Sequence, residues 1–424
     1  MKVLQIFDPL PPEGGLRTGG GSTAGHEKRV KLLNPGIAPF QGGWRVKKWK
    51  VKRTYMNTDS RIYVAGHTGL VGSALTKTLQ EKGYTNLILR TMEELDLTDQ
   101  KAVDAFFAEQ KPEYVLIAAA KVGGIVANNT LRADFIYVNL MIQNNMIHSA
   151  WKHGVTKLLF LGSTCIYPKN APQPLKEDYL LTSQLEFTNE PYAIAKIAGL
   201  KMCESFNLQY RTNFIAVMPT NLYGHGDNYN LEASHVLPAL LRKFHLGKCL
   251  EDGNFEAVRK DLDRYPVEKV NGNSEKESIV RILDKYGVRY THSEKVEVGI
   301  WGTGTPLREF MNSKDMAEAC VFIMENIDVK DIAAIHTAGV TDPEYHPPHF
   351  LNIGTGEEIT IRDLAYKIKA LTGFGGEVVF DTTKPDGTMR KATDTTALKG
   401  LGYKHKISLD QGIRRTYEEY LRYK

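Results

Sequence analysis

The chain has 424 residues, enough to bury a sizeable core and to hold two or three domains. Its composition, 42% hydrophobic and 24% charged, is ordinary for a globular protein, and no apolar run approaches the length of a membrane span. The net charge of +5 comes from residues 1–55, which hold 11 Lys/Arg and three Asp/Glu. The rest is mildly acidic, which argues against a nucleic-acid-binding surface.

Four scattered cysteines form neither a C-x-x-C pair nor a metal-like cluster, so we expect no metal and free thiols in a reducing compartment, the cytoplasm. Residues 1–55 are rich in Gly and Pro, end in a basic run, and lack both apolar periodicity and the apolar region of a secretory signal. We therefore expect a disordered basic leader that buries too little surface to fold onto the body.

The first regular pattern begins at Arg61. Residues 61–65 predict a buried strand, and Gly66, Gly69 and Gly72 follow it at spacings of three before a helix that ends near Gly83. Glycines in a strand–turn–helix context allow a tight turn and close backbone approach to a pyrophosphate. The motif indicates a dinucleotide site, although a turn that merely needs glycine has the same letters.

Strands and helices then alternate at a spacing typical of a doubly wound parallel sheet. The predicted strands are Asn86–Arg90, Tyr114–Ala120, Lys157–Leu161 and Asn213–Met218, and the predicted helices are Asp96–Glu109 and Arg132–Lys152.

Tyr192 and Lys196 stand four residues apart after Pro191, so a helix would place both side chains on one face. A nearby ammonium favours the phenolate and lowers the pKa of a tyrosine, which suits general acid–base work near neutral pH. A hydroxyl of Ser163 or Thr164 could hold a substrate carbonyl against the phenol, and the sequence does not choose between them. Taken alone, the pair is better explained by an ordinary amphipathic helix, because both residue types are common.

The second half begins with a predicted helix, Ser234–Gly247, that carries His235 at its start. Residues 249–297 are charged and weakly apolar, with a capping box at Ser274–Glu277 that opens a helix through Tyr286. We expect this stretch to be an insertion, an appendage or lid without a core of its own. The domains predicted are 56–230 for the dinucleotide and 231–424 for the substrate, with some strands returning to the first sheet.

Six motifs together resemble the GDP-L-fucose synthases, a branch of the extended short-chain dehydrogenase/reductase family. The resemblance runs from Arg61 to the C-terminus apart from 249–297. The motifs are Gly66-x-x-Gly69-x-x-Gly72, Ala118–Ile125, Gly162–Pro168, Tyr192-x-x-x-Lys196, Met218–Gly224 and Trp301–Phe310. It implies a Rossmann-type doubly wound parallel sheet with a smaller C-terminal α/β substrate-binding domain, and a homodimer formed through the helices that contain Arg132 and Tyr192.

The resemblance also implies a reaction: GDP-4-keto-6-deoxy-D-mannose is epimerised at C3 and C5 and then reduced at C4 with NADPH to GDP-L-fucose. It assigns Ser163, Tyr192 and Lys196 to the reduction and Cys165 and His235 to the epimerisation. The substrate residues implied are Ser163, Asn221, Lys243, Trp301, Arg308 and Lys391. The cofactor residues implied are Gly66, Gly69, Leu70, Val71, Gly72, Arg90, Asp96, Leu97, Ala118, Ala119, Tyr192, Lys196, Pro219, Asn221, Leu222 and His235.

The chemistry of these side chains is consistent with that reaction. A C4 ketone acidifies the neighbouring C–H bonds, and the enolate oxygen needs a donor such as Tyr192 or Ser163. A thiol and an imidazole both titrate within reach of pH 7, as an acid–base pair requires. Thr68 and Met92 stand where relatives often carry arginines for the 2′-phosphate, which leaves Arg90 as the nearest cation. NADP(H) is therefore expected, with NAD(H) not excluded.

Two other functions stay open at this point. One is a nucleotide-sugar 4-epimerase or 4,6-dehydratase of the same family, although a dehydratase usually has an acidic pair where this chain has Cys165 and Ile166. The other is a regulator that senses a dinucleotide without catalysis, although such proteins tend to lose the Tyr/Lys pair that Tyr192 and Lys196 retain.

Overall fold

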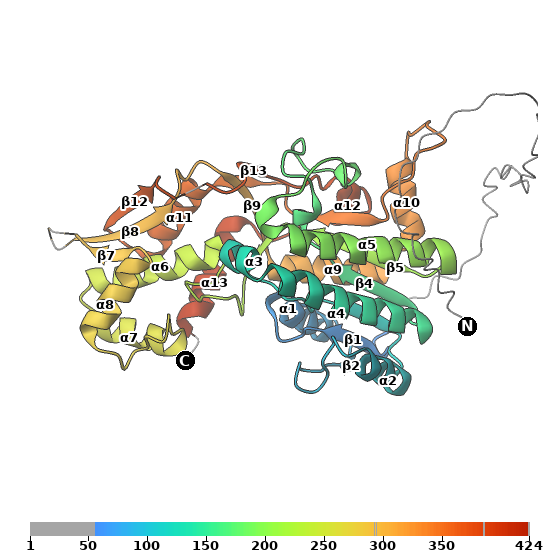
Figure 1. Ribbon diagram of the computed structural model, residues 1–424, viewed down its shortest axis with the longest axis horizontal. Helices are drawn as coiled ribbons and strands as arrows, with labels where there is room; N and C mark the ends of the chain where they lie inside the picture. Colours follow the sequence, from blue (N-terminus) through green and yellow to red (C-terminus); the bar gives the residue numbers. More distant parts are fainter. Residues whose placement is uncertain (1–55, 292, 294, 385, 423–424) are drawn as a thin grey trace, which may run out of the picture. The chain divides into compact units, whose positions relative to one another are not determined.

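The computed structural model describes residues 56–422 apart from 292, 294 and 385, with the backbone alone for 125 and 126 (Figure 1). The basic leader predicted for residues 1–55 lies outside the described residues. Within the described part of the chain, no helix is both long and apolar enough to cross a bilayer.

The largest sheet has six parallel strands in the order β10-β5-β4-β3-β1-β2. Five strands come from the first half of the sequence, and β10 returns from the second half to pair with β5. The strands are β1 (Ile62–Ala65), β2 (Leu87–Ile88), β3 (Tyr114–Ile117), β4 (Lys157–Leu161), β5 (Phe214–Pro219) and β10 (Phe350–Ile353).

Helices bury both faces of this sheet, as the near-continuous apolar strands require. Alternate strand residues enter two separate cores: Ile62, Val64 and Leu116 pack with α1 and α9, whereas Tyr63 and Val115 pack with the other helices. One layer contains α1 (Leu70–Glu81) and α9 (Ser313–Asn326); the other contains α2 (Gln100–Gln110), α4 (Arg132–Lys152) and α5 (Glu190–Tyr210). Figure 1 shows α4 and α5 running side by side. The prediction of a doubly wound parallel sheet is confirmed.

Local sequence explains several of the helix boundaries. The first helix ends at Glu81, with Lys82 as its C-cap, and the next residue, Gly83, takes a left-handed φ of +86°. The second begins one turn later than predicted from Asp96, because the Asp99 carboxylate caps the backbone N–H groups of Lys101 and Ala102.

The second half of the described chain builds two small sheets and a separate core. One sheet holds β11-β9-β13 with β6 paired to β9, and the other holds β12-β8-β7. Their strands are β6 (Asn221–Tyr223), β7 (Val288–Tyr290), β8 (Val296–Trp301), β9 (Leu307–Asn312), β11 (Glu358–Thr360), β12 (Glu377–Asp381) and β13 (Arg390–Lys391). The accompanying helices are α6 (Val236–Glu251), α7 (Phe255–Arg264), α8 (Lys276–Lys285), α11 (Ile361–Thr372) and α13 (Leu409–Arg422). Three short helices complete the fold: α3 (Ile125–Thr130), α10 (Val329–Thr337) and α12 (Thr396–Gly400).

In the part of the chain that the structure describes, residues 249–297 have no core of their own, as expected, but they are built into a core shared with other helices and do not form an appendage. Val258, Leu262 and Ile279 of α7 and α8 are fully buried in the same core as α6, α11 and α13. The fully buried Arg242 of α6 forms an ion pair with Asp261 of α7, 2.7 Å between nitrogen and oxygen, which ties the segment in further.

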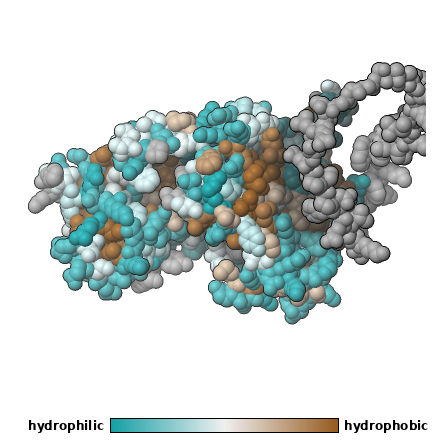
Figure 2. Space-filling model, in the orientation of Figure 1, coloured by the Kyte–Doolittle hydropathy of each residue, from teal (hydrophilic) through white to brown (hydrophobic). Residues whose placement is uncertain are grey.

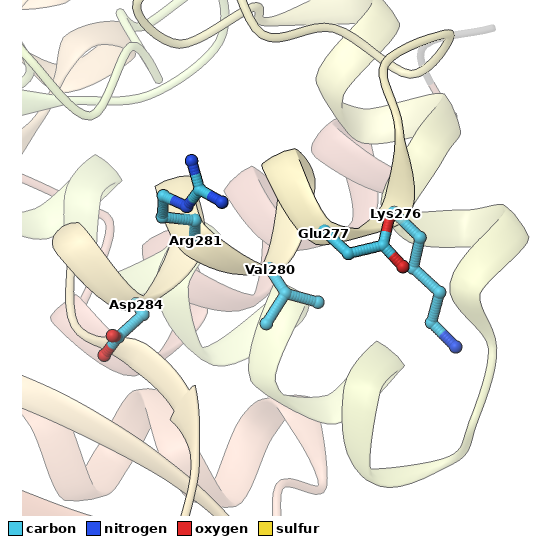
Figure 3. A pocket seen from close by; sticks show the side chains of 5 residues that line it. All are labelled: Lys276, Glu277, Val280, Arg281 and Asp284. Carbon is cyan, nitrogen blue, oxygen red and sulfur yellow. The ribbon is translucent and has the colours of Figure 1, made fainter.

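The charged composition of this segment belongs to the outward faces of two short amphipathic helices. Figure 3 shows the side chains of α8 that surround a shallow surface depression, including Lys276, Arg281 and Asp284. The predicted capping box is also wrong: Glu275 is the N-cap, and the Ser274 hydroxyl instead accepts the N–H of Asn271 at 3.1 Å.

Truncation of Leu262 tests whether α7 belongs to the core. Removing a fully buried leucine side chain leaves a cavity, so Leu262→Ala should lower the free energy of unfolding by about 2–5 kcal/mol. Urea denaturation followed by circular dichroism measures the change. Lys260→Ala, on the exposed side of the same helix, is the matched control and should change stability by less than about 0.5 kcal/mol. Equal midpoints for Leu262→Ala and wild type would mean that α7 is an appendage after all.

Candidate active site

The glycine loop after β1 fits closely against the end of β3 and the start of α1. Gly66 has φ +80°, and a Cβ there would lie 2.7 Å from the backbone nitrogen of Ala119. A Cβ on Gly72 would lie 1.9 Å from the Gly66 carbonyl oxygen, whereas one on Gly69 would meet no atom closer than 3.5 Å. Gly66 and Gly72 therefore allow the loop to pack against β3 and α1, whereas Gly69 leaves space over the first turn of α1.

That space is suited to a pyrophosphate. The N-terminus of the 12-residue α1 begins at Leu70 and Val71, and its N-cap Gly69 has no side chain to occupy the free N–H groups. Ala118 and Ala119 follow the end of β3 and are partly exposed, and their small side chains leave room for a ligand beside the glycine loop. The predicted cofactor residues of this region are thus brought together in a geometry that fits a dinucleotide.

The region after β2 offers one cation. Arg90 donates to the Leu89 carbonyl at 2.8 Å and its guanidinium lies 5.9 Å from the ring centroid of Phe106. The Asp96 carboxylate accepts from the backbone N–H and hydroxyl of Thr98, and these hydrogen bonds lower its pKa. Met92 is 78% exposed and brings no charge. Leu97 is buried beside this turn.

Ser163 is presented at the end of β4. A Cβ on the preceding Gly162 would lie 2.3 Å from the sulfur of Met218, so only glycine passes this point of the sheet without displacement. Ser163 stays partly exposed, and its hydroxyl accepts the N–H of Cys165 at 3.3 Å. Thr164 is buried, so of the two hydroxyls left open by the sequence, Ser163 is the accessible one.

Tyr192 and Lys196 lie on one face of α5, as the sequence predicted. The Lys196 ammonium donates to the Leu161 carbonyl at 2.7 Å and lies 5.6 Å from the centroid of the Tyr192 ring. The tyrosine packs edge-on against Phe135 of α4, with ring centroids 6.4 Å apart. The lysine thus links α5 to the strand that carries Ser163.

The predicted lowering of the Tyr192 pKa is wrong: in this structure the pKa is raised. Burial raises the pKa of Tyr192, with a smaller contribution from Cys165 in the same direction. Burial also lowers the pKa of Lys196 to about 8. The ammonium is bound to the Leu161 carbonyl, and desolvation of the phenolate dominates over its attraction. Tyr192 therefore remains a phenol, the form that can donate a proton.

Cys165 and His235 approach the same cation from different segments. Cys165 is buried in the short 3₁₀ helix Thr164–Ile166; burial raises its pKa, while Lys391 is the largest influence that lowers it. His235 is the N-cap residue of α6, and although it keeps solvent contact, desolvation and then Lys391 lower its pKa. Lys391 therefore favours both the thiolate and the neutral imidazole.

Arg308 and Lys391 stand in register on the parallel strands β9 and β13. Neither cation has an ion-pair partner among the described residues, and both have a pKa lowered mainly by burial. Two adjacent cations without a carboxylate partner suit an anion such as a diphosphate. One hydrogen-bonding group of the Asn221 side chain, on β6, is already used, since its amide donates to the Glu309 carbonyl oxygen at 2.8 Å. Leu222 follows in the same short strand.

Lys243 and Trp301 lie beside the other small sheet. Lys243 of α6 donates to the Gly299 carbonyl at 3.1 Å, and burial lowers its pKa to about 8. Trp301, at the end of the same strand, is 61% exposed, and the Lys384 ammonium lies 5.7 Å from its ring. Pro219 ends β5 at the edge where Ser163 is presented.

The sequence reasoning missed Glu309, which is fully buried between Arg308 and Phe310. A carboxylate at an inward position of a strand was the available signal, since buried charges require partners. In the described part of the chain, no group of three or more His, Cys, Asp or Glu side chains could hold a metal ion.

Comparison with known proteins agrees with this geometry. Residues 62–262 and 270–339 match the sequence profile of the NAD dependent epimerase/dehydratase family. Within the stretch expected to be an insertion, the match takes in residues 249–262 and 270–297.

Similar proteins share nearly their whole length with this chain. It is 49% identical over 366 residues to a putative GDP-L-fucose synthase 2 from Arabidopsis thaliana (86% of this chain, 93% of the relative). It is 46% identical to the GDP-L-fucose synthase of Escherichia coli K12 (86% and 97%). A solved GDP-mannoheptose C4 reductase from Campylobacter jejuni with NADP bound is 43% identical, covers 86% of this chain and 99% of its own, and has a TM-score of 0.74. The chain therefore belongs to the NAD dependent epimerase/dehydratase family, in the group that contains the GDP-L-fucose synthases.

Proposed function

We propose that this protein makes GDP-L-fucose from GDP-4-keto-6-deoxy-D-mannose, by epimerisation at C3 and C5 and NADPH-dependent reduction at C4. The observation that carries this assignment is the convergence of Ser163, Cys165 and Tyr192 at one sheet edge, with Lys391 acting on both Cys165 and His235. Identities of 46–49% to GDP-L-fucose synthases over most of the chain support the substrate.

In the epimerisation, one side chain removes a proton next to the C4 ketone and another returns a proton to the opposite face. Cys165 and His235 fill these roles: burial keeps a proton on the Cys165 thiol even though Lys391 acts against it, while desolvation and Lys391 favour the neutral, proton-accepting imidazole of His235. The phenol of Tyr192 and the accessible hydroxyl of Ser163 donate to the C4 oxygen while negative charge develops there. The same two donors then serve the reduction.

In the reduction, the protein holds the C4 oxygen and supplies its proton. The cofactor, when bound, provides the hydride for C4, and its pyrophosphate is held at Gly69 and the start of α1. Tyr192 is kept as a phenol by burial and transfers its proton to the C4 oxygen. The Lys196 ammonium favours the phenolate that this transfer leaves behind. Arg308 and Lys391 hold the diphosphate of the sugar nucleotide.

A reductase for a different GDP sugar is the nearest rival, because a solved relative with 43% identity is named for GDP-mannoheptose. Both chemistries need Tyr192, Lys196 and a C4 ketone. The assignment therefore depends on proton exchange at C3 and C5, which reduction alone does not require.

Substitution of Cys165 tests that exchange. Cys165→Ala should slow deuterium incorporation from D₂O into GDP-4-keto-6-deoxy-D-mannose by about a hundredfold to ten-thousandfold, since a positioned acid or base is lost. Mass spectrometry of the keto sugar, without NADPH, measures it, and NADPH affinity should stay at the wild-type value. Cys203→Ala, at another buried thiol, is the matched control and should exchange normally. Exchange at the wild-type rate in Cys165→Ala would make Cys165 a packing residue.

The lowered pKa of Lys196 gives the reduction a pH dependence. Since that pKa is about 8, the ammonium is present below pH 8 and is lost above it, while Tyr192 stays protonated throughout. Single-turnover NADPH oxidation should therefore fall as pH rises through about 8. A deuterium isotope effect from labelled NADPH verifies that hydride transfer is the step observed. The slow residual rate of Lys196→Met should lack this transition. A wild-type rate that stays flat or rises between pH 7 and 9.5 would contradict the role of Lys196.

We also propose that two copies associate through α4 and α5, in the cytoplasm. An apolar patch lies over these helices in Figure 2, and a shallow pocket between them is lined by Ala133, Ile136, Pro191 and Ile194. Tyr137 on α4 is 63% exposed and Ile194 on α5 is 40% exposed. Exposed apolar patches of this kind mark protein interfaces. Four free thiols are consistent with a reducing compartment.

A charge in the patch tests the dimer. Ile194→Asp should shift the protein from dimer to monomer in analytical ultracentrifugation, because a carboxylate would be desolvated at the interface. Leu421→Asp, on the distant and 54% exposed end of α13, is the control and should leave the mass unchanged. A monomeric wild type, or an Ile194→Asp protein of unchanged mass, would rule out this interface.

A further inference from the structure

Glu309 of β9 is a fully buried carboxylate with five hydrogen-bond donors around it. Its first oxygen accepts the backbone N–H groups of Thr355 at 2.5 Å and Gly356 at 2.9 Å, and the Thr355 hydroxyl at 3.4 Å. Its second oxygen accepts from Thr393, at 2.7 Å from the backbone N–H and 2.6 Å from the hydroxyl. Three of these donors are backbone N–H groups, which cannot accept, and each carboxylate oxygen faces at least one of them.

The backbone carbonyl of Glu309 also accepts hydrogen bonds, and its side chain packs closely against a neighbouring loop. The Glu309 carbonyl accepts the amide of Asn221 at 2.8 Å and the hydroxyl of Thr220 at 3.3 Å. A Cβ on Gly354 would lie 2.1 Å from the Glu309 carboxylate, so the loop after β10 approaches it as closely as glycine allows. Glu309 thus joins β9 to three segments that are distant in sequence.

Two of these segments carry or adjoin a group assigned to the sugar nucleotide: one contains Asn221, and the other contains Thr393, close to Lys391. Arg308 precedes Glu309 on β9 and, unlike it, stays partly exposed, since neighbouring strand residues face opposite sides. Lys391 is in register with Arg308 and lies two residues before Thr393. A second clamp holds the same stretch, because the Ala392 carbonyl accepts the Leu175 N–H at 2.7 Å.

We propose that Glu309 is the positioning residue of the GDP-sugar site, which fixes Lys391 beside Arg308 by holding Thr393 and the Thr355–Gly356 loop to β9. This inference rests on the proposed function for the identity of the nucleotide sugar. Arg308 and Lys391 repel each other when the site is empty, and a nearby negative charge offsets that repulsion. A neutral residue in the same place would leave donors unpaired and would remove one of the negative charges that act on Lys391.

The variant Glu309→Gln tests the proposal with the full-length protein. Each carboxylate oxygen accepts at least one backbone N–H, so the amide nitrogen of Gln must face a backbone donor, and the segment at Thr393 or at Gly356 must move. Affinity for GDP-mannose, measured by calorimetry, should fall roughly tenfold to a hundredfold. Affinity for NADPH, measured by fluorescence, should change less than about threefold.

Asp315→Asn is the matched control for a change that affects stability alone. Asp315 is likewise buried, and its carboxylate accepts the N–H groups of Lys406 at 3.1 Å and Ile407 at 2.8 Å, outside the proposed site. It should lower the melting temperature while GDP-mannose affinity stays within about threefold of wild type. Equal affinity losses for Asp315→Asn and Glu309→Gln would reduce Glu309 to a folding residue and overturn the proposal.

A double variant shows whether Glu309 acts through Lys391. Lys391→Ala should itself weaken GDP-mannose binding, and adding Glu309→Gln to it should weaken binding by less than about threefold more. If the two substitutions weaken GDP-mannose binding independently, so that their fold-losses multiply in the double variant, the mechanism is refuted. Wild-type affinity in Lys391→Ala would refute it as well.

If Glu309→Gln does not fold, Thr393→Val offers a second test. It removes the hydroxyl that donates to Glu309 and should give a smaller loss of GDP-mannose affinity; wild-type affinity in this variant would also refute the proposal. Because binding of GDP-mannose is measured without turnover, failure of the proposed reaction in wild type is a separate outcome.

Discussion

The hydrogen bond between the Lys196 ammonium and the Leu161 carbonyl is the contact on which the site depends. At 2.7 Å it connects α5 to the end of β4 across 35 residues of sequence. It holds Tyr192 near the segment that presents Ser163 and Cys165, and Gly162 lets that segment pass the Met218 side chain without displacing it. The cost is a buried ammonium, whose lowered pKa reflects the desolvation.

Burial also decides the protonation state of the other groups. Charged forms of Tyr192 and Cys165 are disfavoured, so the phenol stays protonated and the thiol needs the help of Lys391. The protein therefore separates its roles by environment: a phenol that gives a proton to oxygen, and a thiol and imidazole that share a nearby cation. Glu309 accepts hydrogen bonds from Thr393 and so holds β13, which carries Lys391, in place.

The substrate side has a core of its own, and residues 249–297 supply a large part of it. The helices α7 and α8 look polar as sequence because each buries only a narrow stripe, represented by Val258, Leu262 and Ile279. The buried pair of Arg242 and Asp261 lies within that core and holds α6, the helix that begins at His235, against α7. Packing of the segment therefore bears on the position of His235, to which we assign a role in epimerisation.

The sequence by itself determined the doubly wound sheet, the glycine turn and the helical spacing of Tyr192 and Lys196, because these depend on periodicity and on local steric limits. The helix from Arg132 to Lys152 was predicted with its observed bounds for the same reason. The sequence could not determine which hydroxyl is accessible or that the pKa of Tyr192 is raised. Nor could it determine that residues 249–297 pack into a shared core, or what Glu309 does. Each of these depends on desolvation and on partners far away in the chain: Glu309 meets Thr355 and Thr393 only after three segments have packed together. Local pattern predicts elements and motifs, whereas burial and long-range hydrogen bonds, which set the chemistry, exist only in the tertiary structure.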